Sequence, residues 1–218
     1  MMARMERLTI PTPKGDVSAV WHRADGPALV VGHGAGAGMD HPFIVGFCEA
    51  LAGDGIAALR FNFPYMEAGR RTPDQATNAI GAFRAAFETA TERSGGRQVL
   101  AGGKSYGGRI ASMAAVEGMP AAALVFLGYP LHAPGKTDQI RDAHLYDLTI
   151  PMLFLHGTKD PFAEPKELAK VIRRLGDRAT LVDVDGAGHS FERSRKDDPR
   201  VVGASLAPQV AAFVRERL

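Results

Sequence analysis

A serine set among glycines is the residue of this chain best suited to chemistry. Ser105 stands in the run GGKSYGGR, residues 102–109, between a short apolar stretch and a helical pattern. A serine at a sharp turn from a strand into a helix holds its hydroxyl above the sheet, near the positive end of the helix dipole. Glycines on both sides let backbone segments approach more closely than side chains would permit. The run therefore predicts a nucleophilic serine.

A nucleophilic serine needs a base that takes its proton and an acid that orients the base. Asp160 and His189 each follow a separate apolar stretch downstream of Ser105. If these stretches are parallel strands of one sheet, all three side chains emerge at its carboxyl edge, where proteins of alternating helices and strands bind ligands. Asp185 also lies close to His189 in sequence and is the alternative acid.

Hydrolysis also needs backbone N–H groups that stabilise the negative oxygen of the tetrahedral intermediate. One candidate is the amide of Tyr106, directly after the serine. The other should come from the run 33–38, whose glycines let the backbone approach a substrate closely. Phosphate binding is the rival interpretation of this run, and it is disfavoured because the run lacks the lysine and serine of a P-loop.

The elements that must position these residues follow from the hydrophobic pattern. Strands are predicted at 7–10, 16–22, 28–32, 56–61, 98–103, 122–128, 151–155 and 180–184. Helical patterns are clearest over 74–93 and 164–175, and 201–218 predicts a closing helix. Such alternation predicts a mostly parallel eight-stranded sheet with helices on both faces, in a single domain over 1–218.

Six runs of the chain resemble motifs of the α/β-hydrolase superfamily. They are HGAGAGMDHP (33–42), RFNFPY (60–65), GGKSYGGR (102–109), GYPLH (128–132), LFLHGTKDPF (153–162) and GAGHSF (186–191). The chain order serine, aspartate, histidine is also that of the superfamily. The combination looks like the dienelactone-hydrolase-like group. Within that group it looks most like a small branch of predicted bacterial hydrolases that includes animal testis-expressed protein 30 and a subunit of the NSL histone acetyltransferase complex.

The resemblance implies an α/β-hydrolase fold and a serine hydrolase that cleaves a small acyl ester or thioester through an acyl-enzyme. Ser105 would attack, His189 would transfer the proton and Asp160 would hold the imidazole, with no organic cofactor and no metal. By resemblance to hydrolases with an HGx loop, the second oxyanion donor would be the amide of Ala35, with Gly36 next. Dienelactone hydrolase itself has a cysteine nucleophile, so its own substrate is not carried over to this chain.

Two other classes of function remain open. The chain could be a non-catalytic binding scaffold with the hydrolase fold, because a fold does not dictate a function. It could also be a peptidase or an acyltransferase that uses the same three residues. Many α/β-hydrolases carry a helical cap where this chain has only 129–150, which leaves room for one short helix at most. We therefore expect no cap domain and a shallow, open pocket.

Gly36, Tyr65 and Tyr129 are the residues expected to contact substrate. Tyr65 has an alternative role as an anchor of its loop in the core. His132 could line the pocket beside Tyr129, although a structural role is favoured. Lys104 precedes the serine, and the alternation of side chains along a strand predicts that it points away from the hydroxyl.

Arg60, Arg70 and Arg71 stand where the fourth predicted strand leads into a loop over the same sheet edge. An arginine at that place could bind a carboxylate through two parallel hydrogen bonds. The alternative has equal weight: a solvated loop with an ion pair to Glu67 or Asp74.

Composition limits the class of protein. A chain of 218 residues with 45% hydrophobic residues can bury a sizeable core, and its net charge of +2 is too small to indicate a nucleic-acid surface. The single cysteine, Cys48, excludes a disulfide within the chain. The N-terminal residues lack the apolar core of a signal peptide, and no apolar run approaches the ~20 residues of a membrane span. We expect a cytoplasmic enzyme with a small-molecule substrate, without nucleic-acid or membrane partners and of undetermined oligomeric state.

Overall fold

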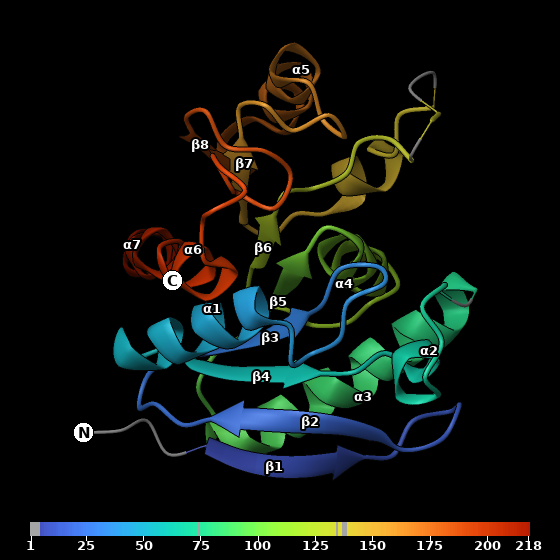
Figure 1. The fold of residues 1–218 in the computed structure, drawn as a ribbon. Helices are drawn as coiled ribbons and strands as arrows, with labels where there is room; N and C mark the ends of the chain where they lie inside the picture. The colour runs from blue at the N-terminus through green and yellow to red at the C-terminus, as the bar shows by residue number, and fades with distance from the viewer. Residues whose placement is uncertain (1–4, 74, 134, 137–138) are drawn as a thin grey trace.

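One twisted sheet of eight strands organises the molecule (Figure 1). The computed structural model describes residues 5–73, 75–133, 135–136 and 139–218. The strands are β1 Met5–Ile10, β2 Val17–His22, β3 Ala28–Gly32, β4 Ala57–Phe61, β5 Val99–Lys104, β6 Leu124–Leu127, β7 Met152–Gly157 and β8 Ala179–Val184. Their order in the sheet is β1-β2-β4-β3-β5-β6-β7-β8, and only the β1–β2 and β2–β4 pairs are antiparallel. The predicted mostly parallel eight-stranded sheet is confirmed.

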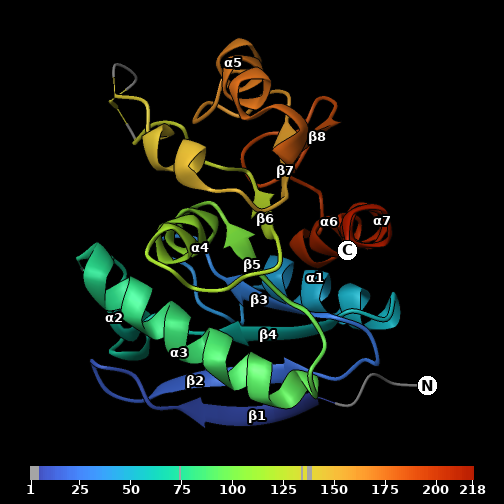
Figure 2. The ribbon, with the colours of Figure 1, turned by 180° about the vertical axis from the view of Figure 1, so that it is seen from behind.

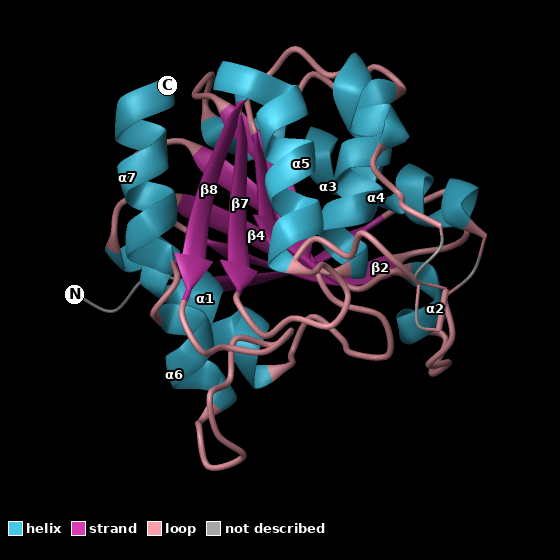
Figure 3. Cartoon of the chain, turned by 90° about the horizontal axis from the view of Figure 1, so that it is seen from above, coloured by secondary structure: helices cyan, strands magenta, loops and turns pink. Residues whose placement is uncertain are grey.

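Helices cover both faces of this sheet. They are α1 Pro42–Gly53, α2 Pro64–Glu67, α3 Ala76–Ser94, α4 Tyr106–Val116, α5 Pro165–Leu175, α6 Pro199–Ala204 and α7 Ala207–Arg217, with 3-10 turns η1 Ala143–Asp147 and η2 Gly176–Arg178. Seen from above, α7 and α5 lie on opposite sides of β7 and β8 (Figure 3). From behind, α3 and α4 lie side by side over the same face as α5 (Figure 2).

The strands carry apolar residues toward both faces, because each face is covered by helices. Along β3, Ala28 and Val30 pack in the core under α3, α4 and α5, whereas Leu29 and Val31 pack in the core under α1 and α7. The two cores therefore arise from the alternation of side chains along each strand.

The site residues are positioned by the carboxyl ends of three parallel strands of the sheet. Ser105 directly follows β5, Asp160 follows β7 and His189 follows β8. The pairing of β5 with β6, β6 with β7 and β7 with β8 brings these ends to one edge. The carboxyl-edge placement predicted for the three residues is therefore confirmed.

Two boundaries differ from the predictions. The closing helix predicted over 201–218 is two helices, α6 and α7, which are interrupted at Ser205 and Leu206. Pro208 explains the break: it has no N–H to donate and is tolerated only in the first turn of a new helix. In the described part of 129–150 the only helical element is η1, so the expected absence of a cap holds for those residues.

Candidate active site

Ser105 sits at a strained turn between β5 and α4. Its φ of 49° and ψ of −110° are unusual for a residue with a side chain. Its N–H donates to the carbonyl of Leu127 (3.0 Å), and its own carbonyl accepts from the N–H of Arg109 (3.1 Å). These bonds hold the strained conformation in place between the sheet and the first turn of the helix.

Glycines make this turn possible, as the sequence predicts. A Cβ at Gly103 would lie 2.1 Å from the carbonyl oxygen of Gly32, and a Cβ at Gly107 would lie 2.2 Å from the same atom. Gly103 also has a φ of 144°, which favours glycine. The turn after β5 therefore packs directly on the backbone of β3.

Asp160 holds His189 at the carboxyl edge. Oδ2 of Asp160 lies 2.7 Å from Nδ1 of His189, and its Oδ1 accepts the N–H of Phe162 at 2.8 Å. The alternative acid, Asp185, instead contacts the hydroxyl of Thr158 at 3.4 Å. The residue that contacts the histidine is therefore Asp160.

The bond to Asp160 determines which nitrogen of His189 can act as a base. Because Nδ1 donates to the carboxylate, the neutral ring presents an unprotonated Nε2. Burial lowers the pKa of His189 below its ordinary value, and although the bond to Asp160 opposes this effect, the nearby charge of Lys104 reinforces it. The ring is therefore neutral near pH 7, which is the form that a general base needs.

Lys104 contributes to the same site, which the sequence did not predict. Its ammonium donates to the carbonyl of His189 at 2.8 Å, and its side chain lines the same cavity as Ser105. Because Ser105 is not a strand residue, strand alternation ends between the two, and the direction of Lys104 relative to the serine hydroxyl stays a prediction. Burial lowers the pKa of Lys104 to about 8.

Gly128, at the end of β6, leaves room for the acid and the base. It has a φ of 69°, and a Cβ there would lie 3.1 Å from the carbonyl oxygen of His189 and 3.5 Å from Oδ2 of Asp160. The backbone thus passes directly behind the pair that these two residues form.

The glycine-rich loop after β3 carries Ala35, whose amide is the expected second oxyanion donor. His33 is buried, accepts the N–H of Phe63 at Nε2 (3.1 Å) and donates from Nδ1 to the carbonyl of Gly34 (2.8 Å). In a trans peptide the N–H points opposite to the carbonyl, so the N–H of Ala35 points away from His33. Among the described residues this N–H has no acceptor, and Ala35 lines the cavity.

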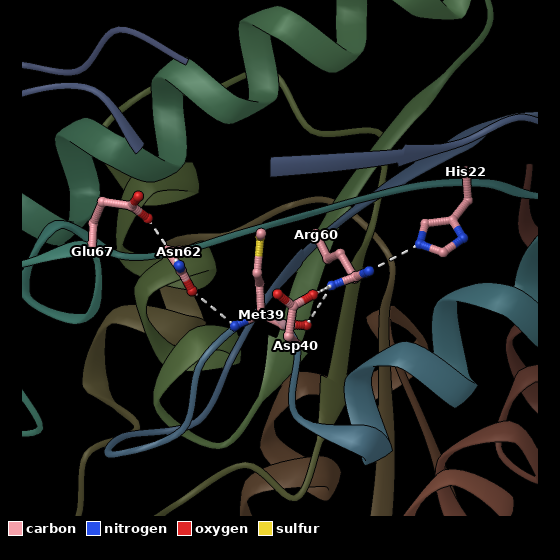
Figure 4. A network of polar contacts seen from close by, with 6 residues as sticks. All are labelled: His22, Met39, Asp40, Arg60, Asn62 and Glu67. Carbon is pink, nitrogen blue, oxygen red and sulfur yellow. Dashed lines mark hydrogen bonds and ion pairs between the residues drawn. The ribbon is translucent and has the colours of Figure 1, made fainter. Parts of the chain in front are cut away.

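The far end of this loop is held by Arg60 (Figure 4). The buried guanidinium donates to Nε2 of His22 (3.1 Å), to the carbonyl of Met39 (2.9 Å) and to the carboxylate of Asp40. Neither alternative for Arg60 is therefore correct: it neither faces a substrate nor pairs with Glu67.

Glu67 accepts instead from the amide of Asn62 (2.9 Å) and from the hydroxyl of Ser18 (2.7 Å). Asn62 in turn accepts the N–H of Met39 at 2.9 Å, so it joins Glu67 to the loop (Figure 4). Asp74, the other acid considered, lies outside the described residues.

Ser105 and His189 open into one cavity of about 770 Å³. Of the other predicted site residues, Ala35, Gly36 and Tyr106 line it, and Asp160 lies behind His189. Tyr65 and Tyr129 do not line it. Both are buried in the core, where Tyr65 packs near His33 and Phe63, and the hydroxyl of Tyr129 donates to the carbonyl of Arg141. Tyr65 thus has the anchoring role that was its alternative, and Tyr129 is likewise held in the core.

His132 lines this cavity, which was one of the two roles considered for it. Its Nε2 also lies 2.6 Å from Oε2 of Glu167 on α5. The contact fixes the ring, so His132 combines a structural role with a place in the cavity wall.

A second serine and histidine pair lies beneath the cavity and was missed by the sequence analysis. Oγ of Ser112 lies 2.8 Å from Nε2 of His144. The same hydroxyl donates to the carbonyl of Arg109 at 2.8 Å, so Nε2 must supply the hydrogen of the other bond. Ser112 is fully buried and does not line the cavity. This pair therefore connects α4 to η1 and does not present a nucleophile.

Two further observations concern metal binding and membrane spanning. Within the described residues, no group of three or more His, Cys, Asp or Glu side chains is arranged to bind a metal ion. In the same part of the chain, no helix has the length and hydrophobicity that crossing a membrane requires.

Solved structures with the same fold include hydrolases from several bacteria. A lidless α/β serine hydrolase from Xanthomonas campestris has 18% sequence identity and a TM-score of 0.74, over 97% of this chain and 95% of the other. An esterase domain from Rhodothermus marinus has 16% identity and a TM-score of 0.72, over 98% of each chain. A dienelactone hydrolase from Anabaena variabilis has 18% identity and a TM-score of 0.76, over the full length of both.

The family assignment comes from the sequence itself. The family model described as an alpha/beta hydrolase domain matches residues 25–215, which include β3 to β8 and every proposed site residue. The narrower resemblance to the branch with testis-expressed protein 30 stays a prediction. Because the match covers most of its length, this chain belongs to the alpha/beta hydrolase domain family.

Proposed function

We propose that this protein is a serine hydrolase that cleaves a small acyl ester or thioester through an acyl-enzyme intermediate. The observation that carries the proposal is the 2.7 Å contact between His189 and Asp160, beside the cavity that His189 shares with the strained Ser105. The proposed nucleophile, acid and base follow β5, β7 and β8 of one sheet, in the chain order of the superfamily.

The proposed reaction follows from these positions. Nε2 of His189 takes the hydroxyl proton of Ser105 as the serine oxygen attacks the acyl carbon. The amides of Ala35 and Tyr106 then donate to the negative oxygen of the tetrahedral intermediate. The imidazolium returns the proton to the leaving alcohol or thiol, and the acyl group stays on Ser105. Water, deprotonated by the same histidine, attacks the acyl carbon. The imidazolium then returns this proton to Oγ of Ser105 as the bond to the acyl group breaks and the acid leaves.

Two observations favour a small substrate. No cap covers the cavity in the described part of 129–150, so the site is open. The structurally similar esterase domain of Rhodothermus marinus and dienelactone hydrolase of Anabaena variabilis are consistent with cleavage of an ester. We infer that no lid movement precedes product release.

Labelling with a fluorophosphonate, read by intact mass, tests the proposal. The wild type should gain one adduct, and Ser105→Ala and His189→Ala should gain none. Ser112→Ala is the matched control, because this serine also contacts a histidine but is buried away from the cavity. Its adduct should persist. A folded wild type without any adduct would contradict the proposal and favour a non-catalytic scaffold.

A further inference from the structure

Positive charge dominates the wall of the cavity that Ser105 and His189 line. Its charged residues are the cations Arg71, Lys104, Arg109, Arg141 and Arg195 and the anions Glu192 and Asp197. A cavity lined mainly by one sign of charge concentrates ligands of the opposite sign. The excess of cations therefore favours an anionic ligand.

Arg109 and Arg141 stand out because their guanidinium groups lack acceptors among the described residues. Within the described ranges of the chain, neither guanidinium has an ion-pair or hydrogen-bond partner, and Nε of Arg109 is buried. Arg60, by contrast, has three partners. A buried donor without an acceptor carries a cost in free energy, which a bound acceptor would remove.

The two guanidiniums also influence each other. Burial is the main cause that lowers the pKa of Arg141, and the positive charge of Arg109 is the next. Two like charges held near one another in a half-buried site destabilise each other, and an anion between them relieves the repulsion. The electrostatics of the pair thus favour a bound anion.

The backbone carbonyls of both arginines accept hydrogen bonds from buried hydroxyl groups. The hydroxyl of Ser112 donates to the carbonyl of Arg109 (2.8 Å), and the hydroxyl of Tyr129 donates to the carbonyl of Arg141 (2.9 Å). Nε2 of His144 lies 2.8 Å from the first hydroxyl and 3.4 Å from the second. This cluster therefore fixes α4 and the segment before η1 relative to each other, and with them the backbones of the two arginines.

We propose that Arg109 and Arg141 form a subsite for an anionic group of the substrate, either a carboxylate or a phosphate. This inference rests on the proposed serine hydrolase activity. Guanidinium groups bind both kinds of anion through parallel hydrogen bonds. Arg109 lies one helical turn beyond Ser105, about 6 Å along α4. The anionic group would therefore be joined to the scissile carbonyl by a short chain.

A pair of matched esters tests the subsite. The probes are the p-nitrophenyl monoester of glutarate, with a free carboxylate, and the same compound with that carboxylate masked as a methyl ester. The wild type should cleave the charged ester with a kcat/KM at least about tenfold higher, the gain expected for hydrogen bonds to a charged group. Arg109→Met and Arg141→Met should each lose about tenfold with the charged ester and less than about twofold with the masked one.

Two controls separate a specific subsite from general attraction. Arg195→Gln removes one positive charge from the exposed part of the same cavity wall and should leave the preference intact. Arg109→Lys keeps the charge but loses the parallel hydrogen bonds, so it should retain only part of the preference. Inhibition by free glutarate but not by inorganic phosphate would assign the subsite to a carboxylate, and the reverse would assign it to a phosphate.

The outcomes distinguish failure of the subsite from failure of the proposed activity. Equal rates on the two esters, or equal losses on both in Arg109→Met and Arg141→Met, would overturn the subsite while leaving the hydrolase in place. Release of p-nitrophenolate from neither ester, together with no fluorophosphonate adduct, would overturn the hydrolase itself.

Discussion

The ammonium of Lys104 donates to the backbone carbonyl of His189 at 2.8 Å, so the residue before the proposed nucleophile holds the loop of the proposed base. The contact links the carboxyl ends of β5 and β8 and places a positive charge beside the imidazole. Its effect on catalysis therefore has two parts, one from position and one from charge.

Substitution of Lys104 should change the pH profile as well as the rate. Because the lysine charge lowers the pKa of His189, its removal raises that pKa, and the acid limb of kcat/KM moves to higher pH. Lys104→Met removes the charge and the hydrogen bond, whereas Lys104→Gln keeps a donor. Both should shift the limb, but only Lys104→Met should also lose about 100-fold in kcat, the cost of a base displaced by about 1 Å. An unchanged acid limb in both variants would contradict the electrostatic effect.

Gly128→Ala should impair catalysis more than stability. The added Cβ would press on the carbonyl of His189 and approach Oδ2 of Asp160, which moves the base from its position. The left-handed backbone adds about 1 kcal/mol of strain, which chemical denaturation would measure. We expect kcat to fall by about 100-fold.

Gly118→Ala is the matched control for this variant. Gly118 has a φ of 95°, and no atom lies within 4 Å of the added Cβ. The substitution therefore adds backbone strain without a steric contact. It should lose a similar free energy of unfolding and keep its kcat. Equal kcat values for the two variants would show that Gly128 serves only the backbone conformation.

His33 should control the proposed oxyanion donor, the N–H of Ala35, through the Gly34–Ala35 peptide. His33→Phe keeps an aromatic ring beside Phe63 and Tyr65 but removes the bond from Nδ1 to the carbonyl of Gly34, so that only the N–H of Ala37 (3.2 Å) still holds this peptide. We expect kcat to fall about 100-fold or more, the effect of one lost oxyanion donor. His33→Asn keeps a donor near the position of Nδ1 and should retain more of the kcat. Similar losses in both variants would argue against control through this carbonyl.

Much of the fold, and part of the site, could be predicted from the sequence. The strands follow from short apolar runs, and Ser105, Asp160 and His189 follow from their places after strands. The partner of Arg60 could not be predicted, because Asp40 reaches it only through the parallel pairing of β3 and β4.

Arg141 carried no sequence signal at all. It lies in a segment without a periodic pattern, and its position depends on Tyr129, whose hydroxyl faces the carbonyl of Arg141 and not the cavity. Local patterns predict elements, whereas such contacts depend on the packing of distant loops. Assignment of 1–218 to a single domain stays a prediction.

Stability should fall steeply as the solution becomes acidic, because two buried histidines are neutral in the folded protein. Burial lowers the pKa of His22 and of His33 to about 4 each, whereas both titrate near 6.5 when the chain is unfolded. Above pH 6.5 neither state binds the proton, so the stability is independent of these groups. As the pH falls from 6.5 toward 4, only the unfolded chain is protonated, and each histidine removes on the order of 3 kcal/mol from the free energy of unfolding. Urea denaturation at pH 7.5 and 4.5 measures this loss of stability.

The double variant His22→Phe, His33→Phe is the control. It should be less stable than the wild type at pH 7.5, but its free energy of unfolding should differ much less between the two pH values. An equal difference in the wild type and the double variant would assign the acid sensitivity to other groups.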